Sequence, residues 1–250
     1  MNTDLQNKIA LVVGGAGEQG MAICKQLSLS GARVIADAPD KAAAARLEKT
    51  FADEGLTIPV YTADVTDFSS CENLVKTVEQ NVGPIDIIIN SVDLSEEVVL
   101  FKDMEKEQWD RILTVNLDAL FNLCKQVAGG MGERGFGRIV NISSATSRMG
   151  QINHTHYATA KAGVHGFTMA LAQELARKGV TVNTVSPGQI ATGNMLALPE
   201  DMRKEKITKI PVARLGKTDE VAYLVDFLCS EQAGFINGAD IAINGGQYMH

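Results

Sequence analysis

KIALVVGGAGEQGMAICKQL, residues 8–27, runs from an apolar stretch through a glycine-rich turn into an amphipathic helical pattern. The unbroken apolar run 9–13 is typical of a strand that is buried on both faces of a parallel sheet. Glycines after such a strand let the backbone approach a pyrophosphate, whose charge the following helix N-terminus stabilises. The spacing of Gly14 and Gly20 fits a dinucleotide-binding loop, G-x-x-x-G-x-G, except that Glu18 stands at the middle glycine position. An ordinary strand-to-helix turn is the alternative interpretation of this stretch.

Apolar, often β-branched runs alternate with helical patterns along the whole chain. We expect strands at residues 9–13, 33–36, 58–62, 85–89, 138–142, 181–185 and 241–243. We expect helices at residues 19–29, 41–54, 68–81, 106–129, 156–177 and 218–228. This alternation implies a doubly wound α/β fold: a seven-stranded parallel sheet with helices on both faces, joined by right-handed crossovers. Because there is no linker or internal repeat, residues 1–250 are expected to form one Rossmann-fold domain.

The composition of the 250-residue chain argues against several classes of protein. Its 45% apolar and 21% charged residues are ordinary for a globular domain with one core. The net charge of −7 argues against nucleic-acid binding, which needs a basic face. No apolar run approaches the ~20 residues that span a bilayer, and the polar N-terminus does not resemble a signal peptide, so we expect a cytoplasmic protein without membrane contact. The four cysteines are widely separated and the four histidines lack ligand spacing, which predicts free thiols and no metal site.

Short polar or backbone-exposing residues stand where the predicted strands end. In a doubly wound sheet, ligands bind outside the carboxyl ends of the strands. After the glycine turn of the first strand, these residues are Asp37, Asp64, Asn90, Ser143–Ser144 and Pro187–Gly188. Turn chemistry alone accounts for any one of them, but their joint occurrence favours a cofactor cleft.

The stretch SATSRMGQINHTHYATAK, residues 144–161, carries a second chemical signal. It places Tyr157 four residues before Lys161, so the two side chains would project side by side from one helix. An ammonium beside a phenol favours the phenolate and lowers the tyrosine pKa from its usual ~10. Tyr157 could then exchange a proton with a carbonyl or alcohol oxygen, while Ser144 hydrogen-bonds the same oxygen. A solvated helix face is the alternative for a Tyr-x-x-x-Lys pair taken alone.

With these residues assembled, the chain resembles the short-chain dehydrogenase/reductase family over its full length. The matching motifs are GGAGEQG (14–20), ADVTD (63–67), IIIN (87–90), VNLDALFN (115–122), GRIVNISS (137–144), YATAK (157–161) and VNTVSPGQIAT (182–192). The second half is most similar to acetoacetyl-CoA reductases of polyhydroxybutyrate synthesis, with the 3-oxoacyl-carrier-protein reductases of fatty-acid synthesis as close relatives. The resemblance implies hydride transfer from NAD(P)H to a short 3-oxoacyl thioester, with acetoacetyl-CoA as the first candidate substrate.

The resemblance also assigns residue roles. Tyr157 would protonate the ketone oxygen, Lys161 would lower the tyrosine pKa and hold the nicotinamide ribose, and Ser144 would orient the carbonyl. Asn116 would hold a water that joins Lys161 to solvent, or it would be a helix asparagine bonded to backbone. The cofactor contacts implied are Gly14, Gly17, Glu18, Gln19, Gly20, Asp37, Asp64, Val65, Asn90, Tyr157, Lys161, Pro187, Gly188, Ile190 and Thr192. The implied substrate contacts are Gln151, Ile152, His154 and Gln189.

Two departures from the family pattern lie on the cofactor side. Glu18 replaces the middle glycine of the loop and brings a carboxylate near the expected pyrophosphate. The fourth strand usually ends Asn-Asn-Ala-Gly in this family, whereas here it reads Asn90-Ser91-Val92-Asp93. Both departures are expected to weaken or reshape dinucleotide binding, and they motivate a third interpretation, a non-catalytic paralogue with poor nucleotide affinity.

Charge at the end of the second predicted strand bears on coenzyme choice. An acid there favours the free ribose hydroxyl of NAD, whereas NADP needs a cation. The segment carries Asp37 and Asp40, which predicts a preference for NADH, although the most similar subfamily commonly uses NADPH. In the alternative interpretation, both aspartates cap the following helix.

The resemblance further implies a substrate lid at residues 189–214 and a homotetramer built through 106–129 and 156–177. Cations of the lid could meet coenzyme A phosphates or form a solvated helix face. A carrier-protein thioester, or another secondary alcohol, is the alternative substrate.

Overall fold

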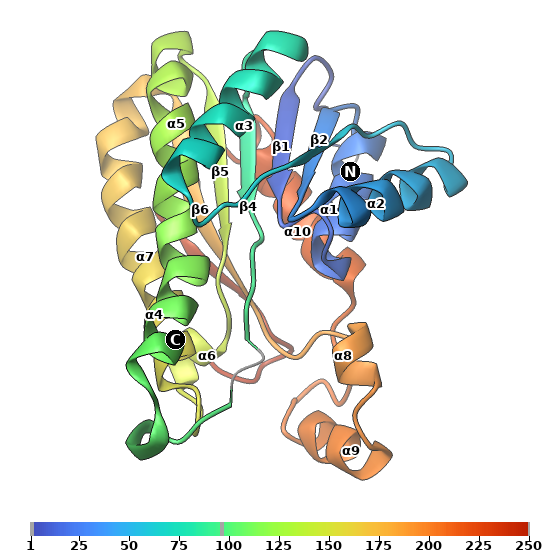
Figure 1. The fold of residues 1–250 in the computed structure, drawn as a ribbon, viewed down its shortest axis with the longest axis vertical. Helices are drawn as coiled ribbons and strands as arrows, with labels where there is room; N and C mark the ends of the chain where they lie inside the picture. Colours follow the sequence, from blue (N-terminus) through green and yellow to red (C-terminus); the bar gives the residue numbers. More distant parts are fainter. Residues whose placement is uncertain (1–2, 96–97, 250) are drawn as a thin grey trace.

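The computed structural model describes residues 3–95 and 98–249, and its core is one seven-stranded sheet. The strand order is β3-β2-β1-β4-β5-β6-β7, and every pairing is parallel (Figure 1). The strands are β1 (Ile9–Val13), β2 (Arg33–Ala38), β3 (Val60–Thr62), β4 (Ile87–Asn90), β5 (Gly137–Ile142), β6 (Val180–Pro187) and β7 (Asp240–Ile243). The order reverses direction between β1 and β4, as a doubly wound fold requires, so the predicted fold class is confirmed.

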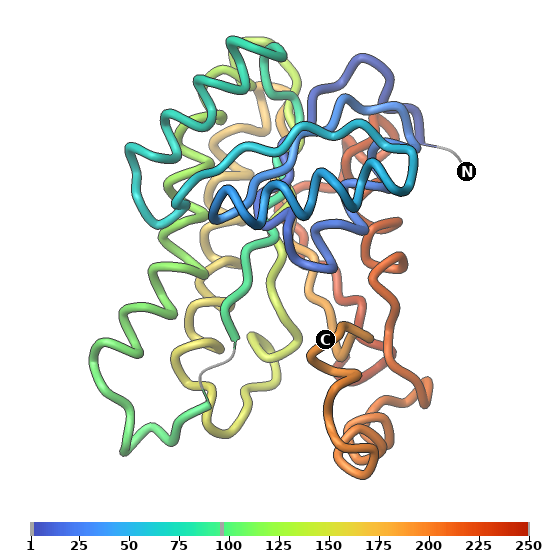
Figure 2. Tube along the Cα trace, turned by 45° about the vertical axis from the view of Figure 1, so that its right-hand side comes forward, coloured from blue at the N-terminus to red at the C-terminus, as the bar shows by residue number. Residues whose placement is uncertain are grey.

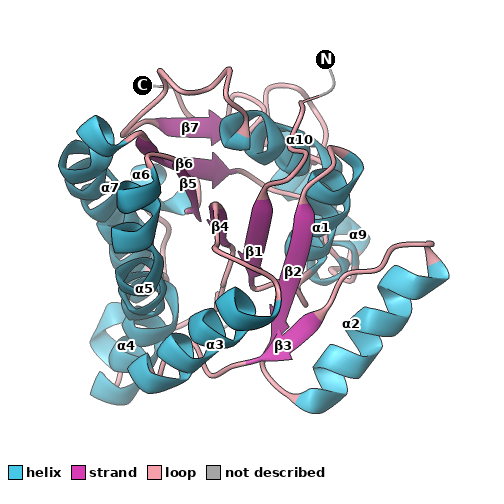
Figure 3. Ribbon diagram, turned by 90° about the horizontal axis from the view of Figure 1, so that it is seen from above, coloured by secondary structure: helices cyan, strands magenta, loops and turns pink. Residues whose placement is uncertain are grey.

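Helices cover both faces of this sheet. The longer ones are α1 (Glu18–Leu29), α2 (Lys41–Asp53), α3 (Phe68–Asn81), α4 (Lys106–Leu113), α5 (Ala119–Arg134), α7 (Thr155–Leu175), α9 (Glu200–Thr208) and α10 (Thr218–Cys229). Short helices are η1 (Phe101–Asp103), α6 (Thr146–Met149), η3 (Ala176–Lys178) and α8 (Gly193–Leu196). Seen from above, α1 and α10 lie on one side of the sheet and α5 and α7 on the other (Figure 3).

The apolar alternation of the strands divides the core in two. Ile87 and Ile89 of β4 pack into the cluster that holds residues of α1, α2 and α10. Ile88, between them, packs into the cluster that holds residues of α3, α5 and α7. A strand that is buried on both faces needs apolar residues at every position, which explains the unbroken runs in the sequence.

The predicted helix 106–129 is interrupted in the structure. One π-helical turn, η2 (Thr114–Asp118), separates α4 from α5, and Asn116 lies within it. The apolar periodicity predicts one helix because a single π-helical turn adds only one residue and leaves the direction of the helix unchanged. A pattern read over several turns does not reveal so small an insertion. The predicted strand and helix limits differ elsewhere by a few residues, and β2 continues to Ala38, so Asp37 lies within the strand.

The glycine-rich turn after β1 is tightly packed. Gly14 has a φ of +81°, and a Cβ there would lie 2.6 Å from the backbone of Ser91 after β4. A Cβ at Gly20 would lie 2.1 Å from the carbonyl oxygen of Gly14. Only glycine allows this approach, so the two ends of neighbouring strands close on each other at the glycine loop.

Replacing Ile88 by alanine tests the two-sided core. The side chain is fully buried, so truncation removes apolar contacts and leaves a cavity, which costs about 2–5 kcal/mol of unfolding free energy. Urea unfolding followed by circular dichroism measures this loss. Leu29→Ala, on a side chain 77% exposed, is the control and is expected to change stability by less than about 0.5 kcal/mol; equal effects of both variants would contradict the two-sided burial of β4.

Candidate active site

The carboxyl ends of β1, β4 and β5 lie next to one another. Val13 pairs with Asn90, and Asn90 pairs with Asn141, so the segments that follow these strands begin at the same edge. The trace after β4, the segment around α6 and the lid with α8 and α9 all lie beyond this edge (Figure 2). Segments far apart in the sequence therefore meet where a doubly wound sheet binds its ligands.

Tyr157 and Lys161 project from the first turns of α7 into this region. Both are buried, and Lys161 Nζ lies 5.7 Å from the centroid of the Tyr157 ring. The ammonium donates to the carbonyl oxygens of Val92 at 3.1 Å and Ile142 at 3.3 Å. Because these carbonyls follow β4 and end β5, the sheet itself fixes the lysine. The predicted pairing of the two side chains on one helix face is present in the structure.

Asp93 joins this pair, and the sequence patterns did not place it there. The Tyr157 hydroxyl donates a 2.8 Å hydrogen bond to Asp93 Oδ1. The same oxygen lies 3.1 Å from Lys161 Nζ. The sequence signals this residue only through its departure from the family pattern, which predicts a change in cofactor affinity and no contact with the tyrosine.

The pKa of Tyr157 lies well above its ordinary value, so the expected lowering by Lys161 is wrong for this structure. Burial disfavours the charged phenolate most, and the nearby Asp93 carboxylate adds to the effect by charge and by hydrogen bonding. Hydrogen bonding by the Ser144 hydroxyl acts in the opposite direction. The phenol is therefore a protonated donor at neutral pH.

Ser144 belongs to a loop that several hydrogen bonds hold in place. Its hydroxyl oxygen accepts from the Thr146 N–H at 3.2 Å, and its carbonyl oxygen accepts from the Ser147 hydroxyl at 2.5 Å. The Ser147 hydroxyl also lies 2.7 Å from His165 Nε2. Ser143 donates to the carbonyl of Lys161 at 2.8 Å, so its role is to hold α7 against β5.

Asn116 makes its hydrogen bonds to backbone. Its amide donates to the carbonyls of Leu94 and Ile112, each at 3.0 Å, and its oxygen accepts from the Leu94 N–H at 3.1 Å. A cavity of about 20 Å³ adjoins it, which is enough for one water molecule. The residues lining the cavity include Asn90, Val92, Asn116, Asn141 and Ile142. The backbone interpretation of Asn116 is thus correct, and the water relay stays a prediction.

The glycine loop fits a dinucleotide at the N-terminus of α1. The N-cap residue there is Gly17, and no side chain caps the helix among the described residues, so the backbone N–H groups of the first turn are free to bind an anion. Asp37 accepts hydrogen bonds from the N–H groups of Gly14 at 2.6 Å and Gly15 at 3.3 Å. Asp40 caps α2 by accepting from the Ala43 N–H at 2.8 Å. The helix-capping alternative therefore holds for Asp40 and not for Asp37.

Glu18 reaches from the glycine loop to the lid. Its Oε1 accepts a 2.7 Å hydrogen bond from the N–H of Gly193, the first residue of α8. A Cβ at Gly193 would lie 2.8 Å from this oxygen. The carboxylate is exposed and links two segments that flank the edge of the sheet. The departure from glycine at this position thus provides a contact with the lid.

The other expected cofactor contacts lie around the same edge, at different depths. Asp64 is exposed and accepts from the N–H and hydroxyl of Thr66, while Val65 accepts from Asn122. Asn90 is buried and donates to Asn141 at 2.8 Å. The remaining residues lie in the first turn of α1, at the end of β6 or just after it, and they are Gln19, Pro187, Gly188, Ile190 and Thr192.

Of the four expected substrate contacts, Gln151 and Ile152 are exposed and the other two are half-buried. Ile152 is 82% exposed, and Gln151 lies in the same turn. The ring of His154 packs edge-on against Tyr157, with centroids 6.3 Å apart. Gln189, in the lid, donates its backbone N–H to the side-chain Oε1 of Gln247, and its carbonyl oxygen accepts from the Gly216 N–H. Of the four, the structure brings His154 into contact with the tyrosine.

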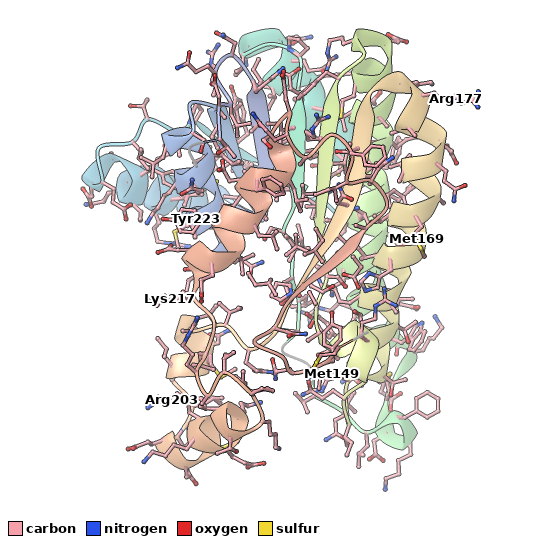
Figure 4. All side chains as sticks on the ribbon, turned by 180° about the vertical axis from the view of Figure 1, so that it is seen from behind. Met149, Met169, Arg177, Arg203, Lys217 and Tyr223 are labelled. Atoms are coloured by element: carbon pink, nitrogen blue, oxygen red, sulfur yellow. The ribbon has the colours of Figure 1, made fainter. Side chains whose placement is uncertain are left out.

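The lid contains two helices that the sequence patterns did not predict. Most of its cations lie on α9, and Arg203 is visible beyond the edge of the sheet in Figure 4. Lys204 pairs with Glu200 at 2.6 Å and Lys209 with Glu205 at 2.7 Å, all four side chains being exposed. These pairs support the interpretation of α9 as a solvated helix face.

Comparisons with known proteins agree with this geometry. A family model described as Enoyl-(Acyl carrier protein) reductase matches residues 15–248. An acetoacetyl-CoA reductase of Allochromatium vinosum is 46% identical over 97% of this chain and 99% of its own length. A 3-oxoacyl-[acyl-carrier-protein] reductase of Vibrio harveyi is 39% identical over 98% and 99%. The crystal structure of gox2181 superposes with a TM-score of 0.92 at 32% identity, covering 98% of this chain and 96% of that one.

The chain belongs to the short-chain dehydrogenase/reductase family. It is an oxidoreductase of that family, and the predicted resemblance is confirmed. The family implies a nicotinamide cofactor. Within residues 3–95 and 98–249, no helix has the length and apolar character to cross a membrane, and no cluster of acidic, histidine or cysteine side chains could hold a metal ion.

Asp37 is expected to make stability depend on pH. Burial raises the pKa of its carboxyl to about 6, although the two glycine N–H groups lower it. Because the folded pKa exceeds that of the unfolded chain, this stabilisation is complete below about pH 4 and is lost as the pH rises through 6, by about 3 kcal/mol at most. Urea unfolding of the wild type between these pH values measures it. Asp37→Asn should flatten the dependence and the exposed Asp53→Asn should not; parallel curves for wild type and Asp37→Asn would contradict the shift.

Proposed function

We propose that the protein reduces the ketone of a short 3-oxoacyl thioester, acetoacetyl-CoA first, to the 3-hydroxyacyl product. The observation that carries this proposal is the convergence of Tyr157, Lys161 and Ser144 at the carboxyl edge of the sheet. The names of the relatives support the substrate class, because acetoacetyl-CoA reductases are 43–46% identical to this chain over nearly its full length.

The chain's own residues supply the proton and the charge stabilisation. A bound nicotinamide cofactor provides the hydride. Tyr157 is buried and protonated, so it can give its proton to the ketone oxygen as negative charge develops there. Lys161, held by two backbone carbonyls, places a positive charge beside the phenolate that forms. Ser144 donates a second hydrogen bond to the same oxygen, and prearranged donors of this kind are usually the largest catalytic contribution.

A proton must return to Tyr157 after each turnover. We assign this supply to a water in the cavity beside Asn116, whose lining includes Asn90 and Asn141 and the two residues whose carbonyls bind Lys161. Asn116 would act by lining this cavity and by fixing the segment after β4 through its hydrogen bonds to Leu94.

The cofactor site is proposed along the glycine loop and the strand ends. The pyrophosphate would lie at Gly14, Gly17, Glu18, Gln19 and Gly20, and the adenosine at Asp37, Asp64, Val65 and Asn90. The nicotinamide would lie by Tyr157, Lys161, Pro187, Gly188, Ile190 and Thr192. Asp37 favours NADH, because a carboxylate accepts from a free ribose hydroxyl and repels a 2′-phosphate.

The acyl group is proposed to lie by Gln151, Ile152, His154 and Gln189. A carrier-protein thioester is the second candidate substrate, supported by the 3-oxoacyl-carrier-protein reductases among the relatives. Residues 189–214 would close over the thioester as a lid. The proposed location of the enzyme is the cytoplasm.

A homotetramer is the proposed assembly, built through the outer faces of α4, α5 and α7. Large apolar side chains are exposed on two of these helices, including Phe121 of α5 and Met169 of α7. Met169 points outward in Figure 4, as does Tyr223 of α10. Burial of such side chains is what a stable subunit interface requires.

Tyr157→Phe tests the acid. Removing the hydroxyl is expected to lower kcat for acetoacetyl-CoA reduction about 10²–10⁴-fold, because the general acid of the proposed reaction is lost. Loss of reduced-nicotinamide absorbance, with NADH and NADPH in parallel, measures the rate. Tyr223→Phe, on an exposed tyrosine, is the matched control. Absence of turnover by folded wild type with either coenzyme, on CoA and carrier-protein thioesters alike, would contradict the proposed function.

Asp37→Ala tests the coenzyme preference. We expect the ratio of kcat/KM with NADH to kcat/KM with NADPH to fall at least about tenfold, which corresponds to 1.4 kcal/mol. Asp40→Ala removes a nearby carboxylate that caps α2 and should leave the ratio unchanged. An unchanged ratio in Asp37→Ala would remove the argument for NADH.

A further inference from the structure

The carboxylate of Asp93 bridges the two groups that the proposed reaction needs. One oxygen, Oδ1, accepts from the Tyr157 hydroxyl at 2.8 Å and lies 3.1 Å from Lys161 Nζ. Its side chain is 46% exposed, whereas that of Lys161 is 1% exposed, so the carboxylate lies on the open side of a buried cation. This inference rests on the proposed function, in which both groups contact cofactor or substrate.

Lys161 has no further proton to donate in this arrangement. An ammonium has three N–H donors. They meet three acceptors: the carbonyls of Val92 and Ile142 and the carboxylate of Asp93. The phenol of Tyr157 likewise has a single proton, and it is donated to Asp93. A ribose hydroxyl on Lys161, or a ketone oxygen on Tyr157, must therefore take the place of Asp93 Oδ1.

The backbone on both sides of Asp93 is held. Lys161 donates to the carbonyl of Val92, and Asn116 binds both the N–H and the carbonyl of Leu94. The carboxylate is thus fixed in position by its neighbours, but its exposed side chain can leave by rotation about its own bonds. Release does not require the buried backbone contacts to break.

We propose that Asp93 is an internal ligand of the Tyr157–Lys161 pair. In the free enzyme its carboxylate occupies the positions of the nicotinamide ribose and of the ketone. Binding of the nicotinamide cofactor displaces the carboxylate. Displacement costs part of the binding free energy, so Asp93 raises the Kd for the cofactor. The negative pyrophosphate adds repulsion between the cofactor and the carboxylate, which also favours its departure.

Cofactor titration of Asp93 variants tests this proposal. Asp93→Asn removes the charge at nearly constant shape, and Asp93→Gly removes the side chain. We expect Kd for NADH, measured by nucleotide fluorescence, to fall about three- to tenfold in Asp93→Gly, as for the loss of a charged hydrogen bond that is partly exposed, and by less in Asp93→Asn. Asp103→Asn, at an exposed aspartate of η1, is the control for net charge and should leave Kd unchanged.

A second measurement needs no nucleotide. Tyrosinate absorbance is followed through an alkaline titration of the free enzyme, with the Tyr157→Phe spectrum subtracted to isolate Tyr157. The pKa of this phenol is raised in part by Asp93, so we expect ionisation at lower pH in Asp93→Asn than in wild type. Thermal unfolding of each variant verifies that it is folded.

The outcomes separate the two proposals. Tighter nucleotide binding in the Asp93 variants, together with ionisation of Tyr157 at a lower pH in Asp93→Asn, supports the role of Asp93. An unchanged Kd, with normal turnover, overturns this role and leaves the proposed function intact. Weaker binding in Asp93→Asn also overturns it, since the carboxylate would then help to hold the cofactor. If no variant and neither coenzyme shows binding, both proposals fail.

Discussion

The ammonium of Lys161 is buried at the point where two strands of the sheet end, and burying a charge is costly unless polar groups surround it. The acceptors that make this position possible are the carbonyl after β4 and the carbonyl at the end of β5. Since β4 and β5 are neighbours in register, their pairing sets the distance between these carbonyls. Because Lys161 and Tyr157 belong to the first turns of α7, these hydrogen bonds hold that part of the helix, and Tyr157 with it, against the sheet.

The need for acceptors around the buried ammonium also explains why the segment after β4 is important for the site. The Val92 carbonyl accepts from Lys161, and Asn116 in the π-helical turn binds the backbone of Leu94, two residues further on. The wider turn brings the asparagine to this backbone without ending the long helix. The catalytic helix, the sheet and the interrupted helix are thereby connected through a few hydrogen bonds between buried groups.

Three carboxylates lie along the cofactor side of the molecule, and each has a different partner. Asp37 is buried beneath the glycine loop and accepts from its N–H groups. Glu18 accepts from the lid, and Asp93 from the catalytic pair. Both departures from the family pattern therefore engage their carboxylates in hydrogen bonds, while the two side chains remain exposed to solvent. Each provides a contact that links the cofactor edge to another part of the fold, which is why their effect extends beyond local repulsion.

The sequence by itself determined the doubly wound fold, the order of elements and the Tyr157–Lys161 pair. Buried parallel strands need unbroken apolar runs, and residues four apart on a helix share one face, so both features are local in the chain. Only the tertiary structure decided the charge environment of the tyrosine, because Asp93 lies 64 positions away along the chain and meets it through the register of β4 and the start of α7. It likewise decided the partner of Glu18, since helical and strand periodicities carry no information on which distant segment a side chain reaches.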